Sequence, residues 1–154
     1  MATRLDTRVP PPVWTLGMAA AQWLLAGCPD YRRRPGPARF FFAGTVGTLS
    51  AVVGIAAVQE FVARGTTVHP GSPEHASVLV TDRIYQYTRN PMYLGFFLFL
   101  AGWAALLSNL VAFALLPAFI AYMNRFQIQP EERALTQQFG TEFQSYMQRV
   151  RRWV

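Results

Sequence analysis

The stretch MYLGFFLFLAGWAALLSNLVAFALLPAFIAYMN, residues 92–124, contains no charged residue. As a single helix it would be about 50 Å long, whereas the hydrocarbon core of a membrane is about 30 Å thick. Two adjacent polar residues, Ser108 and Asn109, divide the stretch near its middle. We therefore predict a helical hairpin with two arms of about 15 residues each, of which the second is kinked at Pro117.

Two further apolar runs precede the hairpin, at residues 13–27 and 40–63. The first is shorter than the roughly 20 residues of a typical spanning helix, and the second is long enough. Small residues in the second run, including Gly44, Gly47 and Gly54, suit close packing between helices. They would also leave room for a lipid to enter between this run and the hairpin. The pattern predicts an all-α integral membrane protein with about four transmembrane helices.

The sequence after Pro130 has a different pattern. Apolar side chains recur at three- and four-residue spacing among glutamines and charges: Leu135, Phe139, Phe143, Tyr146, Met147 and Val150. This spacing is typical of an amphipathic helix that lies on a membrane surface. We expect the residues at its end to anchor it at the interface, namely Arg149, Arg151, Arg152 and Trp153.

The composition favours a membrane location. Of the 154 residues, 52% are hydrophobic and 14% are charged, whereas soluble domains usually contain about 25% charged residues. All basic residues are arginines, and the net charge of +6 suits contact with anionic lipid headgroups. The arginines alternate with apolar runs, which argues against a nucleic-acid partner. We interpret the chain as one membrane domain, with two spans in residues 1–64 and the hairpin and C-terminal helix in residues 65–154.

Residues that commonly bind metals are few. Cys28 is the only cysteine, so one chain cannot form an internal disulfide or a CxxC site. His69 and His75 lie in a segment rich in proline and glycine, without a cluster of carboxylates. We therefore expect no metal site there.

An even number of spans places both chain ends and the 64–91 segment on one side of the membrane. That side contains ten of the arginines and the 28–39 loop contains four. The positive-inside rule therefore predicts both ends in the cytoplasm, with the protein in a bacterial inner membrane. An alternative is that Arg4, Arg8 and the LLAGC sequence form a lipoprotein signal in which Cys28 accepts a lipid.

The segment YTRNPMYLG, residues 87–95, contains a charged turn directly before the hairpin. Asn90 precedes a proline and is disfavoured in helical geometry, so the chain is expected to turn there. Pro91 then suits the first position of a helix, whose free N–H groups could bind a polar or anionic group beside Arg89 and Tyr93. A simpler interpretation is that the segment only caps a helix where it enters the membrane.

The segment QPEERAL, residues 129–135, is the second polar motif. Pro130 suits the first position of a helix, and Glu131 and Glu132 would stabilise the dipole of that helix. The segment follows the arm that returns from the hairpin, so the two acids reach the same membrane face as Arg89. Two acids opposite an arginine could bind a small ligand of mixed charge.

These motifs stand in LVTDRIYQYTRNPMYLG (residues 79–95) and PEERALTQQFGTEFQSYMQRVRRW (residues 130–153), on either side of the hairpin. Together they resemble the isoprenylcysteine carboxyl methyltransferase and phospholipid N-methyltransferase superfamily, over roughly residues 65–153. The resemblance implies an enzyme that transfers a methyl group from S-adenosylmethionine to a lipidic or hydrophobic acceptor at the cytoplasmic membrane face. It agrees with the absence of a strand-borne GxGxxG motif.

The resemblance also implies roles for individual residues. Arg89 and Arg125 are the candidate catalytic residues. The residues implied in cofactor binding are Ser77, Val78, Leu79, Val80, Tyr85, Asn90, Pro91, Met92, Tyr93, Glu131 and Glu132. Carboxylates such as Glu131 suit the amino and hydroxyl groups of the cofactor, and the aromatic faces of Tyr85 and Tyr93 favour its cation.

The sequence departs from the prenylcysteine enzymes at several positions. Residues 82–83 are Asp-Arg where relatives commonly have Ser-Gly, and Ser77 and Asn90 replace histidines. Gln127 replaces the arginine that those enzymes use toward the substrate carboxylate, with Arg125 nearby. The acceptor therefore stays open between a prenylated thiol, an aminolipid and another hydrophobic molecule.

Two other classes of function stay open. Sterol and steroid reductases carry a similar Arg-His-Pro-x-Tyr-x-Gly motif and bind NADPH. They usually place an acidic residue after the glycine, where this chain has Phe96. The chain could also be a small non-enzymatic membrane subunit whose two motifs only cap helices.

Overall fold

The computed structural model describes residues 9–26, 36–65 and 78–154, and these residues form helices without any β-strand. Two helices precede the hairpin: α1, Pro11–Ala26, and α2, Pro37–Ala63. They cover the two apolar runs that were expected to form spans. Cys28, Ser77 and both histidines lie outside the described residues, so the lipoprotein alternative and the role of Ser77 stay predictions.

The predicted hairpin is confirmed, with α3 (Pro91–Leu107) as its first arm and α4 (Leu110–Ala114) and α5 (Leu116–Tyr122) as its second. At the tip, Ser108 adopts a left-handed backbone conformation (φ 51°, ψ 38°). The Asn109 side chain accepts a hydrogen bond from the N–H of Val111 at 2.8 Å. It also donates to the carbonyl of Ala26 at 2.9 Å, so the tip of the hairpin is tied to the end of α1.

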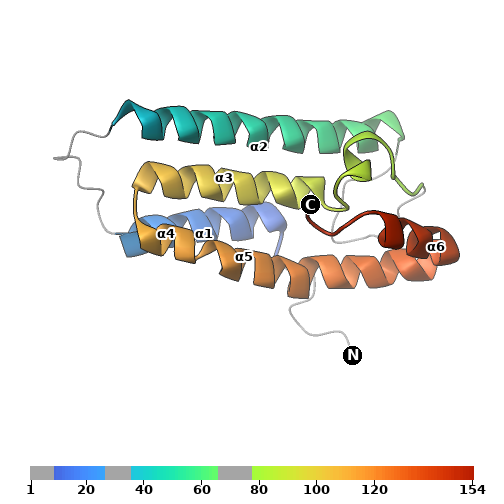
Figure 1. Cartoon of the computed structure of the whole chain (residues 1–154). Helices are drawn as coiled ribbons and strands as arrows, with labels where there is room; N and C mark the ends of the chain where they lie inside the picture. The colour runs from blue at the N-terminus through green and yellow to red at the C-terminus, as the bar shows by residue number, and fades with distance from the viewer. Residues whose placement is uncertain (1–8, 27–35, 66–77) are drawn as a thin grey trace.

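In the described part of the chain, four helical segments lie side by side: α1, α2, α3 and the α4–α5 run (Figure 1). The α4–α5 run is interrupted at Leu115, because Pro117 has no N–H with which to complete the helical hydrogen bonding there. The short 3₁₀ helix η2, Arg83–Gln86, and the last helix, α6 (Gln129–Arg149), lie at the end of the bundle where α3 begins (Figure 1). Both polar motifs therefore meet at one end of the bundle.

Helices α2 and α3 pack backbone against backbone. A Cβ atom added at Gly95 would lie 3.3 Å from the carbonyl oxygen of Ser50 and 3.5 Å from the Cα of Gly54. The Ser50 hydroxyl donates to the carbonyl of Gly95 at 2.8 Å. Further along, a Cβ at Gly102 would lie 3.7 Å from the backbone nitrogen of Gly47. Close helix packing is thus confirmed at Gly47 and Gly54, whereas Gly44 lies on the exposed face of α2. Lipid entry between α2 and the hairpin stays a prediction.

Helix α1 packs against the second arm of the hairpin through a buried hydrogen bond and a stacked pair of aromatic rings. Gln22 is fully buried, and its Nε2 donates to the carbonyl of Ala112 at 2.9 Å. Near the other end of the helix, the ring of Trp14 stacks on that of Tyr122 with centroids 3.8 Å apart. These contacts hold α1 against the second arm of the hairpin.

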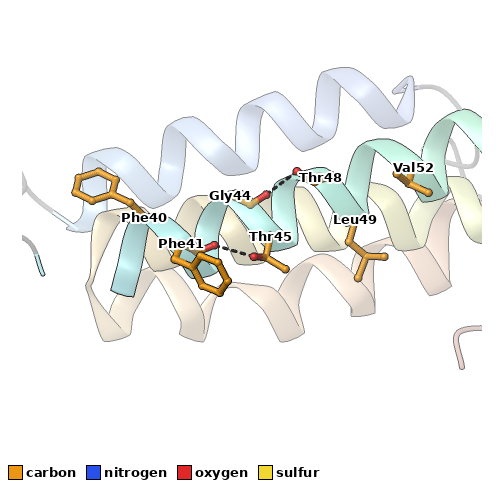
Figure 2. A pocket seen from close by; sticks show the side chains of 7 residues that line it. All are labelled: Phe40, Phe41, Gly44, Thr45, Thr48, Leu49 and Val52. Atoms are coloured by element: carbon orange, nitrogen blue, oxygen red, sulfur yellow. Dashed lines mark hydrogen bonds between the residues drawn. The ribbon is translucent and has the colours of Figure 1, made fainter. Parts of the chain in front are cut away.

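The outer face of α2 is apolar and exposed. Phe41 is 78% exposed, and its apolar neighbours on this face are exposed as well. Figure 2 shows a shallow hollow along this face, and its seven lining residues all belong to α2. The hydroxyls of Thr45 and Thr48 donate to carbonyls of the preceding turn, both at 2.9 Å (Figure 2). Neither hydroxyl therefore needs water, and the face suits contact with hydrocarbon chains.

Within residues 9–26, 36–65 and 78–154, two helical runs are long and apolar enough to cross a membrane. They are α2 and the continuous run Leu110–Arg149. Helix α3 is equally apolar in character but, at 17 residues, is shorter.

The structure corrects the predicted start of the C-terminal helix. Helix α5 continues through a π-helical turn, η3 (Met123–Ile128), directly into α6. Ile128 has helical backbone angles (φ −66°, ψ −47°), so Pro130 lies inside a helical run. The wider π turn gives room to the proline ring, which would otherwise clash with the preceding turn. Glu131 and Glu132 therefore do not lie at an open helix N-terminus, and the dipole does not account for them.

The structure shows what the apolar side chains of the expected amphipathic helix contact within the protein, whereas its position on a membrane surface stays a prediction. Gly140, with φ 53° and ψ −123°, breaks α6 at a backbone conformation that favours glycine. The apolar side chains of both halves pack on the protein, against the end of α2 and the segment 79–85. The members of this cluster are Ala57, Phe61, Val80, Tyr85, Leu135, Phe139, Phe143, Tyr146, Met147 and Val150. The apolar face of α6 thus covers the polar end of the bundle.

Candidate functional site

The turn before α3 forms one wall of the site. As predicted, the chain turns at Asn90 (φ −129°, ψ 57°), and α3 begins at Pro91. The N–H of Asn90 donates to the hydroxyl of Thr88 at 3.2 Å. Tyr93 follows one turn into α3 and is 5% exposed.

Tyr93 and Glu131 connect the two motifs directly. The Tyr93 hydroxyl donates to Oε1 of Glu131, so α3 and α6 are joined by a hydrogen bond between their polar side chains. Around this pair, Tyr93 packs with the apolar core formed by α1, α3 and α5, including Leu100 and Phe119. The pair therefore lies where the apolar core ends and the polar motifs begin.

Glu132 is held by two arginines. Oε1 of Glu132 lies 2.9 Å from Nη1 of Arg89 and 3.0 Å from Nε of Arg152, and Oε2 lies 2.6 Å from Nη2 of Arg152. The hydrogen bonds to Glu132 raise the pKa of the Arg152 guanidinium. Because both carboxylate oxygens are engaged, Glu132 is a structural partner of the arginines in this structure.

Residues 150–154 follow α6 and cross over the turn before α3; we call them the C-terminal strap. The N–H of Arg89 donates to the carbonyl of Arg151 at 2.9 Å. The carbonyl of Arg152 accepts from Nδ2 of Asn90 at 2.9 Å and from the hydroxyl of Thr88 at 3.2 Å. The strap therefore forms hydrogen bonds with three consecutive residues of the turn.

Two of the residues that were expected to anchor the end of the chain at the interface make contacts within the protein, and their anchoring role stays a prediction. Arg152 turns toward Glu132. Trp153 donates from Nε1 to Oδ1 of Asn124 at 3.1 Å and packs edge-on against Phe97 with centroids 6.4 Å apart. A chain end composed of arginines and a tryptophan does not indicate by itself that the chain folds back onto the turn before α3. These contacts could therefore not be predicted from the sequence.

Tyr85 brings a second phenol to the site from η2. It is 5% exposed, and its ring packs edge-on against Phe61 at 5.6 Å. Its carbonyl accepts a hydrogen bond from the hydroxyl of Tyr146 at 2.7 Å, which fixes η2 on α6. Its own hydroxyl is buried and has no hydrogen-bond partner in the part of the chain that the structure describes.

The electrostatics around Tyr85 keep its hydroxyl protonated. Burial raises the pKa of this phenol, and the neighbouring Tyr146, Glu131 and Glu60 raise it further. A neutral, buried hydroxyl near two carboxylates is a hydrogen-bonding group available to a ligand.

Glu60 is a site residue that the sequence reasoning did not select. It lies near the end of α2 and is 7% exposed. Its carboxylate lies 3.3 Å from Nε of Arg83 and 4.0 Å from Nε of Arg64, and Arg64 also contacts Asp82. A carboxylate near the end of an otherwise apolar span was the signal that could have identified it.

The other predicted site residues are distributed around this centre. Val80 and Pro91 are buried, Leu79 and Met92 are partly buried, and Val78 is exposed. Their roles in cofactor binding stay predictions.

Of the two candidate catalytic arginines, the structure places Arg89 beside Glu132. Arg125 is an exposed residue of η3, with its guanidinium 5.5 Å from the centre of the Phe126 ring. Gln127, two residues on, is fully buried and donates from Nε2 to the carbonyl of Val9 at 2.8 Å.

The site thus combines the buried carboxylate of Glu60, the partly buried carboxylate of Glu131 and the hydroxyls of Tyr85 and Tyr93. The ion pairs of Glu132 with Arg89 and Arg152 lie at the same end of the bundle. Among the described residues, no group of three or more His, Cys, Asp or Glu side chains is arranged to hold a metal ion.

A model of the phospholipid methyltransferase family matches residues 39–142. The matched region covers most of the chain, including α2, the turn before α3, the hairpin and both acids. The chain therefore belongs to the phospholipid methyltransferase family, within the superfamily that also contains the isoprenylcysteine carboxyl methyltransferases.

Two relatives show the same relationship over shorter stretches. An uncharacterized protein of Haemophilus influenzae is 43% identical over 63 residues, which are 41% of this chain and all of that protein. The protein-S-isoprenylcysteine O-methyltransferase of Schizosaccharomyces pombe is 37% identical over 73 residues, which are 47% of this chain and 31% of that enzyme. This chain thus spans about a third of the length of the yeast enzyme. No solved structure matches the chain significantly.

Proposed function

We propose that this protein is an integral membrane methyltransferase that uses S-adenosylmethionine and acts on a lipidic or hydrophobic acceptor at the cytoplasmic membrane face. Family membership supports methyl transfer, and the two long apolar helical runs support a membrane location. The similarity to the yeast enzyme favours a reaction like that of the isoprenylcysteine carboxyl methyltransferases.

The observation that carries the proposal is the buried hydroxyl of Tyr85, which has no hydrogen-bond partner among the described residues and whose pKa is raised by burial and by the charges of Tyr146, Glu131 and Glu60. A buried polar group without a partner costs stability unless a ligand satisfies it. A ligand that brings hydrogen-bonding groups and a positive charge would complement this hydroxyl, the two carboxylates and the tyrosine faces. The residues present therefore fit the cofactor that the family implies.

In this proposal, each group has a distinct task. The carboxylate of Glu131 accepts hydrogen bonds from the amino or hydroxyl groups of the cofactor, and Tyr93 orients that carboxylate. The rings of Tyr85 and Tyr93 favour a cation, and the turn at Asn90 shapes the wall beside it. Bound S-adenosylmethionine supplies a methyl group that is already activated by its sulfonium centre. The main requirements on the protein are then to align the acceptor and to exclude water.

The proposal has two candidate acceptors, a carboxyl group as in the isoprenylcysteine enzymes and an aminolipid. An aminolipid is the alternative acceptor, because the matching family model describes phospholipid methyltransferases. We infer that the acceptor is hydrophobic, because the site lies at the end of apolar helices whose outer faces suit lipid. Arg89 remains the candidate for contact with a polar acceptor group, and Arg125 is the second candidate.

Thermal unfolding of the purified protein separates the proposed class from its competitors. We expect S-adenosylmethionine to raise the unfolding temperature and NADPH to leave it unchanged. Stabilisation by NADPH alone would indicate a reductase-like protein, and stabilisation by neither would favour a non-enzymatic subunit.

A labelled-methyl assay separates the two acceptor classes. Membranes containing the protein are incubated with methyl-labelled S-adenosylmethionine, and the organic extract is then treated with alkali. A carboxyl methyl ester releases labelled methanol, whereas an N-methylated lipid keeps its label. Alkali-labile label is expected, and alkali-stable label would exclude a carboxyl methyl ester and favour the aminolipid alternative.

A further inference from the structure

The C-terminal strap connects the two halves of the site through one residue. The guanidinium of Arg152 forms two hydrogen bonds with Glu132 on α6, at 3.0 and 2.6 Å. The carbonyl of the same residue accepts hydrogen bonds from Thr88 and Asn90 of the turn before α3. The turn and α6 are therefore linked through Arg152, in addition to the direct contact between Arg89 and Glu132.

We propose that Arg152 is a positioning residue, which holds the turn at Asn90 against Glu132 and thereby sets Tyr93 opposite Glu131 for cofactor binding. The inference rests on the proposed function, and it assigns to the strap a role that the two motifs alone do not indicate.

The geometry explains why the effect reaches the cofactor pocket. Asn90 stands directly before the first residue of α3, and Tyr93 lies one turn further on. On the other side, Glu131 is the neighbour of Glu132 on α6. The link from Asn90 through Arg152 to Glu132 and the Tyr93–Glu131 hydrogen bond therefore join the same two parts of the fold, the start of α3 and the start of α6. A shift of the turn relative to α6 would change the distance between those two side chains.

The C-terminal strap is also attached through Trp153. A substitution at Arg152 can therefore be tested while the rest of the strap stays in place. Trp153 is bonded to Asn124 and packs on Phe97. With Trp153 in place, a change at Arg152 removes the guanidinium contacts while the strap stays attached. The backbone carbonyl of Arg152 is then present but is no longer oriented by Glu132.

Arg151 provides a matched control. It is the neighbouring residue, has the same side chain and is exposed. Its contact with the turn is made by its backbone carbonyl, which accepts from the N–H of Arg89 and is kept in any substitution of the side chain. Arg151→Gln therefore removes the same charge without removing a contact to Glu132.

The experiment compares Arg152→Gln and Arg151→Gln in the full-length protein in detergent, by amide hydrogen exchange and by calorimetric titration with S-adenosylmethionine. In Arg152→Gln, we expect the amide of Arg89 to exchange about tenfold faster, with amides in the middle of α2 and α3 unchanged. The affinity for S-adenosylmethionine should fall about tenfold, and Arg151→Gln should match the wild type in both readouts.

A lysine at the same position tests whether geometry or charge matters. Lys keeps the positive charge but cannot form two parallel hydrogen bonds with a carboxylate. We therefore expect Arg152→Lys to recover the affinity only in part, and full recovery would contradict a positioning role of the guanidinium.

Other outcomes also decide the inference. Equal exchange of the Arg89 amide in Arg152→Gln and Arg151→Gln would overturn it, and so would faster exchange with unchanged affinity. Uniformly faster exchange throughout the helices would show a general loss of stability and would also overturn it. If the wild type binds no S-adenosylmethionine, the proposed function fails, whereas the exchange data still decide whether Arg152 positions the turn.

Discussion

At the scale of single residues, Glu131 and Glu132 are adjacent in sequence but have different partners. Glu132 is engaged by Arg89 and Arg152, whereas Glu131 accepts a hydrogen bond from Tyr93 beside the buried hydroxyl of Tyr85. The sequence could predict that both acids reach the membrane face of Arg89. It could not predict the division between them, because that depends on the strap, which is distant in sequence from the turn it holds.

Tyr85 gives a prediction at this scale. Its hydroxyl is buried without a partner in the described part of the chain, so Tyr85→Phe removes an unsatisfied polar group. We expect the free energy of unfolding to stay within about 1 kcal/mol of the wild type or to rise, while the affinity for S-adenosylmethionine falls about three- to tenfold. Thermal unfolding and calorimetric titration of the same sample measure the two effects.

Tyr87→Phe is the control for this prediction, because Tyr87 is 76% exposed and lies two residues away. A loss of stability in Tyr85→Phe with unchanged affinity would assign the hydroxyl a purely structural function.

At the scale of elements, the hairpin was predictable and the end of the chain was not. Ser108 and Asn109 interrupt an uncharged stretch, and that local signal is sufficient to place a turn between two helices. The apolar spacing after Pro130 correctly indicated a helix. It could not indicate what the apolar face contacts, because a membrane surface and the end of a helical bundle offer similar apolar partners. Gly140 interrupts α6 at a positive φ, and a single glycine within a helical pattern does not indicate whether the helix continues, bends or ends there.

The contact between α2 and α3 gives a prediction at this scale. A Cβ at Gly95 would lie 3.3 Å from the carbonyl oxygen of Ser50. That oxygen belongs to the backbone of α2, which cannot easily move away from α3. Gly95→Ala should therefore lower the free energy of unfolding by about 1–3 kcal/mol. Gly44→Ala is the matched control in α2, because a Cβ there meets nothing within 4 Å.

Thermal unfolding in detergent measures both variants. We expect Gly44→Ala to be neutral or stabilising by up to about 1 kcal/mol, since alanine favours helix more than glycine does. Equal stability of the two variants would contradict the close packing of α2 on α3.

At the scale of the whole molecule, the four helical segments that lie side by side place both polar motifs, residues 87–95 and 129–135, at one end of the bundle. The even number of expected membrane spans and the distribution of arginines predict that both chain ends face the cytoplasm. Reporter fusions at Val154 and within residues 28–39 should therefore report opposite sides of the membrane. The same side for both positions would contradict a four-span topology.

The overall architecture was accessible from sequence because apolar length, helix breaks and arginine distribution act over short distances along the chain. The site was accessible only in part. The turn at Asn90 and the pair at Glu131 could be assigned from local chemistry and resemblance. Glu60 carried a local signal, a carboxylate near the end of an apolar run, whereas the contact of Arg152 with Glu132 depends on the fold-back of the chain end and is not indicated by its neighbours in sequence.

The central claim is that the polar end of this bundle binds S-adenosylmethionine through Glu131. Calorimetric titration of the wild type, Glu131→Gln and the exposed control Glu142→Gln tests it most directly. We predict saturable binding by the wild type and by Glu142→Gln, and a loss of about ten- to a hundredfold in Glu131→Gln, because a charge-assisted hydrogen bond contributes about 1.5–3 kcal/mol. No saturable binding by the wild type, or wild-type affinity in Glu131→Gln, would contradict the claim.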